Sequence, residues 1–573
     1  MTSSPAFYVQ SSPKYCGPWR FMIQDEVKWV KVHYSSPRRP ESFMPSTFYI
    51  VLIAGIACVL YLRRKRTPAN TRLPPGPPAD PLIGHLRIFP MKDQPEIFHE
   101  WSKQYGDVVH LEVLGRDFII LGSEKAALDL LEKRGANYSD RPHSEMHHLI
   151  GWADMLVFLN YGEQFTKIRR LSQQPFNRKE SENFREIQMR QTHILLHNFL
   201  RTPLEYYKHT LRFATATMME IAYGHRVVSD NDTYLSLIDE GIRVILESGN
   251  IGMSILDIFP VLKHLPAWFP GAWFIRFAAE SREFVHKARE WPFQEVQRDM
   301  AAGTARKSFL SNHLENFAHE GIDSPTEFAD LKTAALLLNQ GITCSWPHYN
   351  TSSTHWLQAG GETTSSAVLL FLFAMLLNPE AQEKAQKEID GVIGTTRLPD
   401  FSDRESLPFV ECLMQETFRC YHPFPLGIPH CSRKDDVYNG MFIPKGSIIF
   451  YNLMTMSSDE KVYANPDKFW PERYLPKPRG NGEPRPALMY GFGRRVCPGR
   501  YLADSALWLV VVSVLATFKI SYTQDEQGDD IIPPTEYNTS TTRRPKPFSC
   551  RIQARGPWAE KLILDAYDET LRA

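Results

Sequence analysis

The sequence lacks an excess of charge of either sign. Its 573 residues include 65 lysines and arginines and 65 aspartates and glutamates, so the formal net charge is zero. A chain without a basic surplus has no general electrostatic attraction for a polyanion. The composition therefore argues against nucleic acid as a partner.

The sequence also lacks the cysteine pairs that build disulfide frameworks and zinc sites. Eight cysteines are scattered along the chain, and none of them forms a Cys-x-x-Cys pair. This usage is typical of a reducing compartment. No internal repeat and no dinucleotide-binding or flavin-binding motif is present. If the protein uses electrons, we expect a separate protein to supply them.

Residues 44–62 form an uncharged apolar run that is about as long as one bilayer crossing requires. Arg-Arg-Lys-Arg follows at residues 63–66, which is typical of a cytoplasmic flank. The run is too long for the apolar core of a cleaved signal peptide, and no small-residue cleavage site precedes Arg63. We predict a single-pass anchor in the endoplasmic reticulum membrane, with the rest of the chain in the cytosol.

Residues 1–43 conflict with this orientation, because they place basic residues on the predicted lumenal side, among them Lys28, Lys31, Arg38 and Arg39. Translation from Met44 would give a clean charge asymmetry. We therefore hypothesise that residues 1–43 are an upstream extension of the gene model and not a functional domain.

The patterns beyond the anchor predict a mainly helical protein with small β-sheets. Residues 63–86 are basic and proline-rich, and the prolines at 73–78 predict an extended hinge that sets the pose of the domain on the membrane. Alternation over 107–122 and 436–454 predicts two β regions, the second with a turn at Asn439-Gly440. Residues 124–317 are mostly helical in pattern, and residues 500–518 are apolar on every side, which predicts a buried helix.

The run Tyr490-Gly-Phe-Gly-Arg-Arg-Val-Cys-Pro-Gly-Arg500 places a lone cysteine, Cys497, just before that helix. The helix N-terminus and the nearby arginines favour the thiolate, so we predict that Cys497 ionises easily. Gly493 and Gly499 would let a flat cofactor approach closely. A single cysteine does not suit a zinc or iron–sulfur site, whereas it suits the axial position of a haem iron. An incidental cysteine on a surface loop is the alternative.

This run resembles the cysteine loop of the cytochrome P450 family of haem-thiolate monooxygenases, Phe-x-x-Gly-x-Arg-x-Cys-x-Gly. The chain matches the signature at four positions: Gly493, Arg495, Cys497 and Gly499. It departs at the first position, where Tyr490 keeps the ring and adds a hydroxyl that needs a partner. The resemblance implies the family's fold, with haem b between a long central helix and the cysteine loop. It also implies that Cys497 binds the iron and that Tyr490, Gly491 and Gly499 contact the cofactor.

Two other segments resemble motifs of the same family. Ala-Gly-Gly-Glu-Thr-Thr at 359–364 opens an apolar helix and resembles the oxygen-binding segment, which implies that Glu362 and Thr363 relay protons to dioxygen. A helix start with ordinary glycines is the alternative. Glu-Thr-Phe-Arg at 416–419 resembles the family's Glu-x-x-Arg, which implies a buried structural triad of Glu416, Arg419 and Arg473.

The resemblance also implies partners for the two haem propionates. Arg495 and His430 are candidates, and Arg169 is a third, in a segment that resembles the family's Trp-Arg-x-x-Arg helix. Phe165 replaces the tryptophan of that motif and Thr166 stands where arginine is usual. Phe165 has no N–H, so one propionate bond worth about 1 kcal/mol would be missing.

Residues 341–358 depart most from the family, because they are polar and aromatic and include Pro347 and a Thr-Ser-Ser-Thr run. These residues oppose helix formation. Without them, residues 330–378 would form one apolar helix of the length that the family's central helix needs. We hypothesise that the segment is a retained in-frame intron that breaks this helix.

The resemblance covers about residues 73–555 and implies that residues 87–573 form a monooxygenase domain. It would insert one oxygen atom from O2 into a small lipophilic substrate, in fungal secondary or xenobiotic metabolism. The chain is similar to fungal microsomal members, among them the O-methylsterigmatocystin oxidoreductase-like enzymes. NADPH would supply electrons through cytochrome P450 reductase, with cytochrome b5 as a second candidate donor.

Three other functions remain open at this point. A haem-thiolate isomerase or dehydratase would use Cys497 without the acid–alcohol pair. A haem-binding pseudoenzyme would be disabled by residues 341–358, and a membrane scaffold would bind no haem.

Overall fold

The computed structural model describes residues 71–229, 232–234, 240, 244, 248, 254–339, 359–538 and 542–572. The chain divides into two compact units, Met1–Val59 and Leu60–Ala573, and every described residue belongs to the second. The predicted extension at 1–43, the predicted anchor at 44–62, the first part of the hinge and the predicted insert at 341–358 lie outside the described residues.

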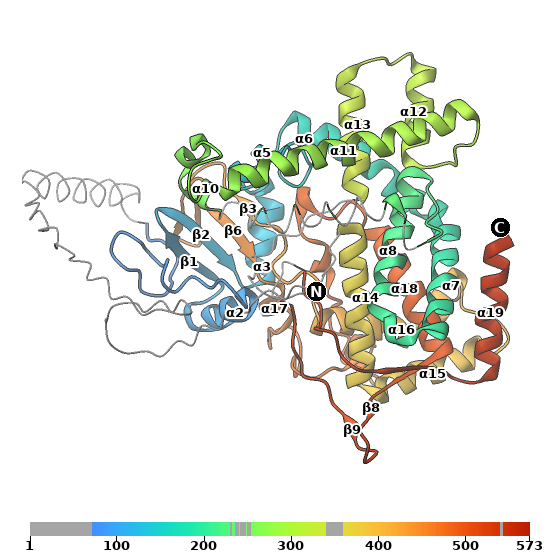
Figure 1. The fold of residues 1–573 in the computed structure, drawn as a ribbon. Helices are drawn as coiled ribbons and strands as arrows, with labels where there is room; N and C mark the ends of the chain where they lie inside the picture. Colours follow the sequence, from blue (N-terminus) through green and yellow to red (C-terminus); the bar gives the residue numbers. More distant parts are fainter. Residues whose placement is uncertain are drawn as a thin grey trace, which may run out of the picture. The chain divides into compact units, whose positions relative to one another are not determined.

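Twelve long helices dominate the described residues (Figure 1). They are α2 (Gln94–Tyr105), α6 (Glu163–Gln173), α7 (Arg185–Arg201), α8 (Tyr206–Tyr223), α11 (Trp273–Ala302), α12 (Phe309–Glu320), α13 (Pro325–Asn339), α14 (Ala359–Leu377), α15 (Pro379–Val392), α16 (Pro408–Cys420), α18 (Arg500–Thr517) and α19 (Pro557–Arg572). Shorter helical segments include α3 (Glu124–Ala127), η1 (Leu128–Lys133), α4 (Gly135–Tyr138), α5 (Glu145–Leu149), α10 (Ile255–Ile258) and α17 (Leu453–Ser457). The prediction of a mainly helical protein with small sheets is confirmed.

The largest sheet among the described residues has four strands in the order β1-β2-β6-β3. β1 (Val108–Val113) and β2 (Arg116–Leu121) pair antiparallel, as the alternating pattern predicted. Leu114 and Gly115 connect them with φ of 49° and 81°, a left-handed turn that suits glycine. β2 then pairs in parallel with β6 (Ile448–Tyr451), which joins the two predicted β regions into one sheet.

The remaining strands are short. β3 (His430–Cys431) pairs with β6, and β4 (Asp436–Tyr438) pairs with β5 (Met441–Ile443) across the predicted Asn439-Gly440 turn. Nearer the C-terminus lie two further pairs: β7 (Phe518–Ser521) with β10 (Arg551–Ala554), and β8 (Thr523–Gln524) with β9 (Asp530–Ile531).

Residues 73–78 of the hinge form neither helix nor strand, as predicted, and turns follow at 81–83 and 85–88, but the hinge is fastened to the sheet and is not a free spacer. The backbone N–H of His110 in β1 donates to the Pro75 carbonyl at 3.0 Å. A Cβ on Gly76 would lie 2.1 Å from the His110 carbonyl oxygen, so only glycine permits this approach. The hinge therefore ends against β1.

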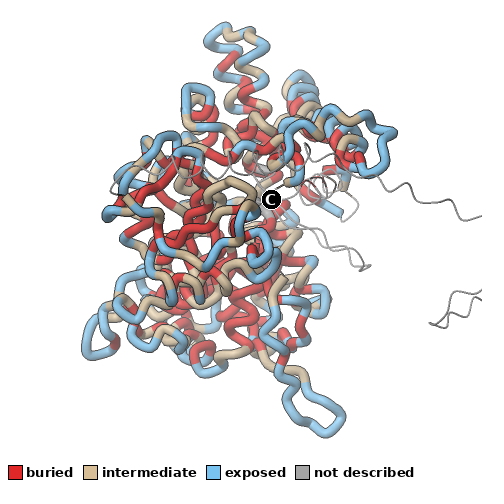
Figure 2. Tube along the Cα trace, turned by 90° about the vertical axis from the view of Figure 1, so that its left-hand side faces the viewer, coloured by how far each residue is buried: buried red, intermediate tan, exposed pale blue. Residues whose placement is uncertain are grey.

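The core lies around α8, α14 and α18, which supply most of its largest cluster of buried apolar side chains. Figure 2 shows buried segments inside the molecule and exposed segments around them. α18 is the predicted all-apolar helix, and most of it is inside the protein. Among the described residues, α18 is the single helix that is long and apolar enough to cross a membrane, but 72% of it is buried inside the protein. α14 and α15 together are also long and apolar enough, but they are bent by 104° relative to each other. Burial identifies α18 as a core helix.

α13 and α14 flank the predicted insert. α13 ends at Asn339 and α14 begins at Ala359. The two helices contact each other and follow one another end to end in Figure 1. α14 also packs on α8, α16 and α18, so it runs through the centre of the helical region.

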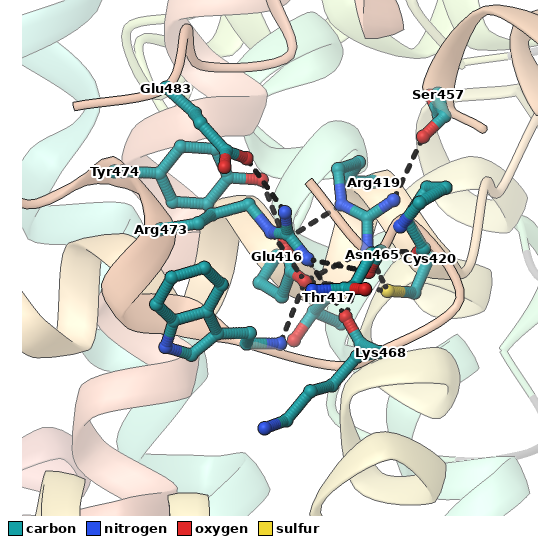
Figure 3. Close-up of polar contacts among 12 residues, drawn as sticks. Glu416, Thr417, Arg419, Cys420, Ser457, Asn465, Lys468, Arg473, Tyr474 and Glu483 are labelled. Carbon is teal, nitrogen blue, oxygen red and sulfur yellow. Dashed lines mark hydrogen bonds and ion pairs between the residues drawn. The ribbon is translucent and has the colours of Figure 1, made fainter. Parts of the chain in front are cut away.

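The predicted charged triad is confirmed (Figure 3). Glu416 in α16 accepts from Arg419 Nε at 2.8 Å and from Arg473 Nε at 3.0 Å. The three side chains are at most 2% exposed. The Tyr474 hydroxyl donates to the same carboxylate at 2.8 Å. The triad thus fastens α16 to the segment that leads toward the cysteine loop.

Candidate active site

The cysteine loop is a tight turn that is closed by its own backbone. The N–H of Cys497 donates to the Tyr490 carbonyl at 2.8 Å. Gly491 and Gly493 have φ of 80° and 51°, in the left-handed region that favours glycine. A Cβ on Gly493 would lie 2.5 Å from the Leu131 carbonyl oxygen, so this glycine lets the loop pack on η1. Packing on η1 thus accounts for this glycine, and close approach of a cofactor here stays a prediction.

Gly499 differs from Gly493. A Cβ on Gly499 would meet no other protein atom within 4 Å, so this position is open. Its backbone N–H points to the Cys497 thiol and favours the thiolate. Gly499 thus remains a candidate for contact with a cofactor.

The Cys497 thiol does not ionise easily in the protein alone. Burial raises its pKa, and this outweighs the Gly499 N–H and the charges of Arg169 and Arg500, which act in the opposite direction. The prediction of a readily formed thiolate is therefore wrong for the chain by itself. A bound metal ion would reverse the balance, because it deprotonates a coordinating thiol.

Arg495 is held by backbone carbonyls and an aromatic ring. Its guanidinium donates to the carbonyls of Ser139 at 2.7 Å, Leu156 at 2.9 Å and Leu159 at 2.5 Å. The same group lies over the Phe165 ring of α6, 3.9 Å from its centroid. Burial and the neighbouring guanidinium of Arg141 lower the pKa of Arg495.

Arg141 is a fourth basic candidate, which the sequence did not single out. It is 6% exposed and donates to the carbonyls of Val157 at 3.0 Å, Ile428 at 2.9 Å and Pro429 at 2.7 Å. Burial lowers its pKa to about 10. An arginine that follows an aspartate belongs to no recognisable motif, so the sequence does not predict its role. Only the fold shows that it lies beside Arg495 and His430.

His430 lies on β3 among these arginines. Its Nδ1 donates to the Tyr138 carbonyl at 2.6 Å. Burial, together with the charges of Arg141 and Arg495, lowers its pKa well below the usual value. The ring is therefore neutral and its Nε2 carries no proton. It can donate to a propionate only if the anion first brings a proton onto the ring.

Arg169 of α6 holds the cysteine loop from the other side. Its Nη2 donates to the carbonyl of Val496 at 2.6 Å, and its Nε donates to Gln173 at 2.9 Å. Burial lowers its pKa, while the adjacent Cys497 raises it. α6 therefore presents Arg169 to the residue before the cysteine and Phe165 to Arg495.

These residues fit a haem. Arg141 is a buried cation, Arg169 and Arg495 are half-buried, and none of the three forms an ion pair with a carboxylate in the described part of the chain. Buried charges are normally paired. The two propionates of a haem would supply the missing negative charge. The Cys497 thiol of the loop would supply the ligand for its iron. Tyr490, whose buried hydroxyl has no partner among the described residues, is the departure from this fit.

Glu362 and Thr363 lie in the first turns of α14. Glu362 is fully buried, and the hydroxyl of Thr542 donates a hydrogen bond to its Oε1. α14 contacts α18, which begins directly after the cysteine loop. The acid–alcohol pair and Cys497 therefore belong to neighbouring elements of the core.

Comparison of the sequence with known proteins gives the same family as the motifs at this site. The family model described as Cytochrome P450 matches residues 74–551. Cytochrome P450 monooxygenase COX2 of Coprinopsis cinerea is 38% identical over 515 residues, which are 89% of this chain and 94% of that protein. Cytochrome P450 monooxygenase 136 of Postia placenta is 37% identical over 89% of this chain and 93% of its own length.

A third relative, Cytochrome P450 monooxygenase claR of Ampulloclitocybe clavipes, is 36% identical over 91% of this chain and 93% of its own length. Matches of this extent cover the cysteine loop, the triad and α14 together. The chain therefore belongs to the cytochrome P450 family and is a haem-thiolate monooxygenase of that family.

Proposed function

We propose that Cys497 is the thiolate ligand of the haem iron and that Arg141, Arg169 and Arg495 neutralise the propionates, with His430 as a further partner. The observation that carries this proposal is a group of three guanidiniums, one buried and two half-buried, that have no carboxylate partner in the described part of the chain. Tyr490, Gly491 and Gly499 would line the cofactor, and Gly499 has the open space for it. The ring of Phe165 would hold the Arg495 guanidinium in place by contact with its face.

The haem, when bound, supplies the iron at which dioxygen is activated for insertion of one oxygen atom into a C–H bond. Glu362 and Thr363 would move protons toward that site, since both lie in the first turns of α14. The hydrogen bond that the Thr542 hydroxyl donates to the buried carboxyl of Glu362 supports this role, because a network of this kind can hold a proton-carrying group in place.

We propose a small lipophilic substrate that arrives from the membrane, in fungal secondary or xenobiotic metabolism. The apolar run at 44–62 and its basic flank support a single anchor in the endoplasmic reticulum membrane with the catalytic domain in the cytosol. The absence of a dinucleotide or flavin motif from the sequence supports electron supply by NADPH–cytochrome P450 reductase, with cytochrome b5 as a second donor.

The carbonyl difference spectrum of the reduced full chain tests the iron ligand. We expect a thiolate-type Soret band that Cys497→Ser abolishes and that Cys550→Ser, a change at a buried cysteine outside the loop, leaves in place. An unchanged band in Cys497→Ser would overturn the proposal. An imidazole-type band in the unmodified chain would favour a damaged pseudoenzyme, and absence of haem would favour a scaffold. Product formation that needs no NADPH would favour an isomerase or dehydratase.

We further propose that residues 341–358 are a retained intron and that residues 1–43 are an upstream extension. The helix-opposing composition of the first segment supports the intron. Sequencing of spliced transcripts tests it, and messages that always encode Trp346 and His348 would refute it. Deletion of residues 341–358 should raise the haem-to-protein ratio of the purified chain. Peptide mapping of the native N-terminus tests the extension, and abundant peptides between Tyr15 and Lys31 would refute it.

A further inference from the structure

The C-terminal segment after β9 reaches back to α14. Its hydroxyl-bearing residue Thr542 is fully buried and donates a hydrogen bond to the carboxylate of Glu362, 180 residues earlier in the chain. No motif of the sequence points to Thr542. The contact therefore places a residue without an assigned role on the carboxyl group that the proposed function uses.

The backbone around Thr542 is held on several sides. The N–H of Asn538 donates to the Arg544 carbonyl at 3.0 Å, and the N–H of Lys546 donates to the Glu536 carbonyl at 2.9 Å. The N–H of Arg543, the next residue, donates to the Pro423 carbonyl at 2.9 Å. Thr542 thus lies on a paired segment that is fixed to the loop after α16. The backbone hydrogen bonds of this segment therefore fix the position of the Thr542 hydroxyl.

The segment is fastened to α8 as well. The Tyr206 hydroxyl donates to the Phe548 carbonyl at 2.6 Å, and the Tyr207 hydroxyl donates to the Pro545 carbonyl. α8 in turn contacts α14, where the Ser365 hydroxyl donates to Thr210 at 3.1 Å. Ser365 is three residues beyond Glu362, so α8 and the C-terminal segment hold the same part of α14.

We propose that Thr542 is a positioning residue that fixes the carboxyl of Glu362 and sets the pH at which it carries a proton. This inference rests on the proposed role of Glu362 in proton supply. A hydroxyl that donates to a carboxylate stabilises the ionised form over the protonated form. Because Glu362 is fully buried, water cannot replace a lost hydrogen bond easily. Removal of the hydroxyl should therefore keep the proton on Glu362 to higher pH.

Three variants separate the hydroxyl from its packing. Thr542→Val keeps the shape and removes the donor, whereas Thr542→Ser keeps the donor. Thr210→Val is the matched control, because it removes another fully buried hydroxyl that contacts α14 but not Glu362. Infrared difference spectra of the purified full chain between acid and alkaline pH report protonated carboxyl groups, and Glu362→Gln identifies the band of Glu362.

We expect the midpoint of that band to rise by about one pH unit in Thr542→Val, since a hydrogen bond to a charged group of this strength corresponds to such a shift. Thr542→Ser and Thr210→Val should keep the original midpoint. An unchanged midpoint in Thr542→Val, an equal shift in Thr542→Ser, or the absence of any titrating band that Glu362→Gln removes would each overturn the inference.

NADPH oxidation with added reductase, without added substrate, gives the second measurement. Its pH profile should move to higher pH in Thr542→Val and should lose this dependence in Glu362→Gln. If Glu362→Gln instead keeps the original profile, the proposed proton role of Glu362 fails. The infrared midpoint still decides whether Thr542 controls the carboxyl, so the two failures are distinguishable.

Discussion

The guanidinium carbon of Arg495 lies 3.9 Å from the centroid of the Phe165 ring, although the two residues are 330 positions apart. The ring supports the guanidinium from one face while three carbonyls hold its edges. The family's tryptophan at this position would keep that face and add an N–H. The replacement by phenylalanine therefore removes a donor and not the support.

This relationship predicts the effect of Phe165→Trp. The indole N–H should add one hydrogen bond to a propionate, worth about 1 kcal/mol, and slow haem loss about fivefold. Transfer of haem to an excess of apomyoglobin measures the rate. Phe165→Leu, which removes the aromatic face, should lose haem faster than the unmodified chain. Faster loss from Phe165→Trp would mean that the buried site has no room for the indole.

Arg141→Met should weaken haem retention. The change keeps an unbranched apolar side chain but removes a buried cation, and loss of a hydrogen bond to a charged group accelerates haem loss about tenfold. The same transfer assay measures it. Arg87→Met is the matched control, because the side chain of Arg87 is 74% exposed and pairs with Asp80 at the surface. Equal rates in Arg141→Met and the unmodified chain would exclude Arg141 from the site.

Haem uptake should depend on pH through Cys497. Burial keeps the pKa of this thiol above its ordinary value of 9.0, so the free protein holds the proton at neutral pH. Binding of the iron must release it, and affinity should therefore rise about tenfold per pH unit below the pKa of the thiol. Above that pKa the rise should end. Haem titrations of the apoprotein from pH 6 upward measure this, as the difference between the unmodified chain and Cys497→Ser. A difference that does not change with pH would show that the thiol is already ionised.

Glu416→Gln should destabilise the fold strongly. The change leaves the buried guanidinium of Arg419 without its carboxylate partner and leaves Arg473 with Glu483 alone, which costs about 3–5 kcal/mol. Denaturant unfolding of the haem-loaded chain measures the loss. Glu383→Gln breaks an exposed pair with Lys387 and should cause no measurable change. If both variants unfold at the same denaturant concentration, the triad contributes nothing beyond a surface pair.

Much of the fold followed from local patterns. Alternation and the Asn439-Gly440 turn gave the strands, because a hairpin turn needs left-handed backbone that these residues adopt readily. The all-apolar composition of residues 500–518 gave the buried helix, since such a surface has no face for water. The triad could be predicted because two of its members, Glu416 and Arg419, are three residues apart on one helix face.

The electrostatics of the site did not follow from the sequence. Arginines next to Cys497 suggested an easily formed thiolate, yet desolvation proved the larger influence, and desolvation depends on what packs around the sulfur. Arg141 and Thr542 were missed for a related reason. Each is an ordinary residue in its own segment and acquires its partner only when distant segments meet.

The sequence by itself therefore determined the family, the helical fold and the cysteine that is the candidate iron ligand, because these depend on short motifs and local periodicity. The tertiary structure alone decided which cations gather near the cysteine loop, which glycine is needed for packing and which hydroxyl donates to Glu362. Those properties depend on contacts between residues that lie hundreds of positions apart in the chain, and no local pattern encodes such contacts.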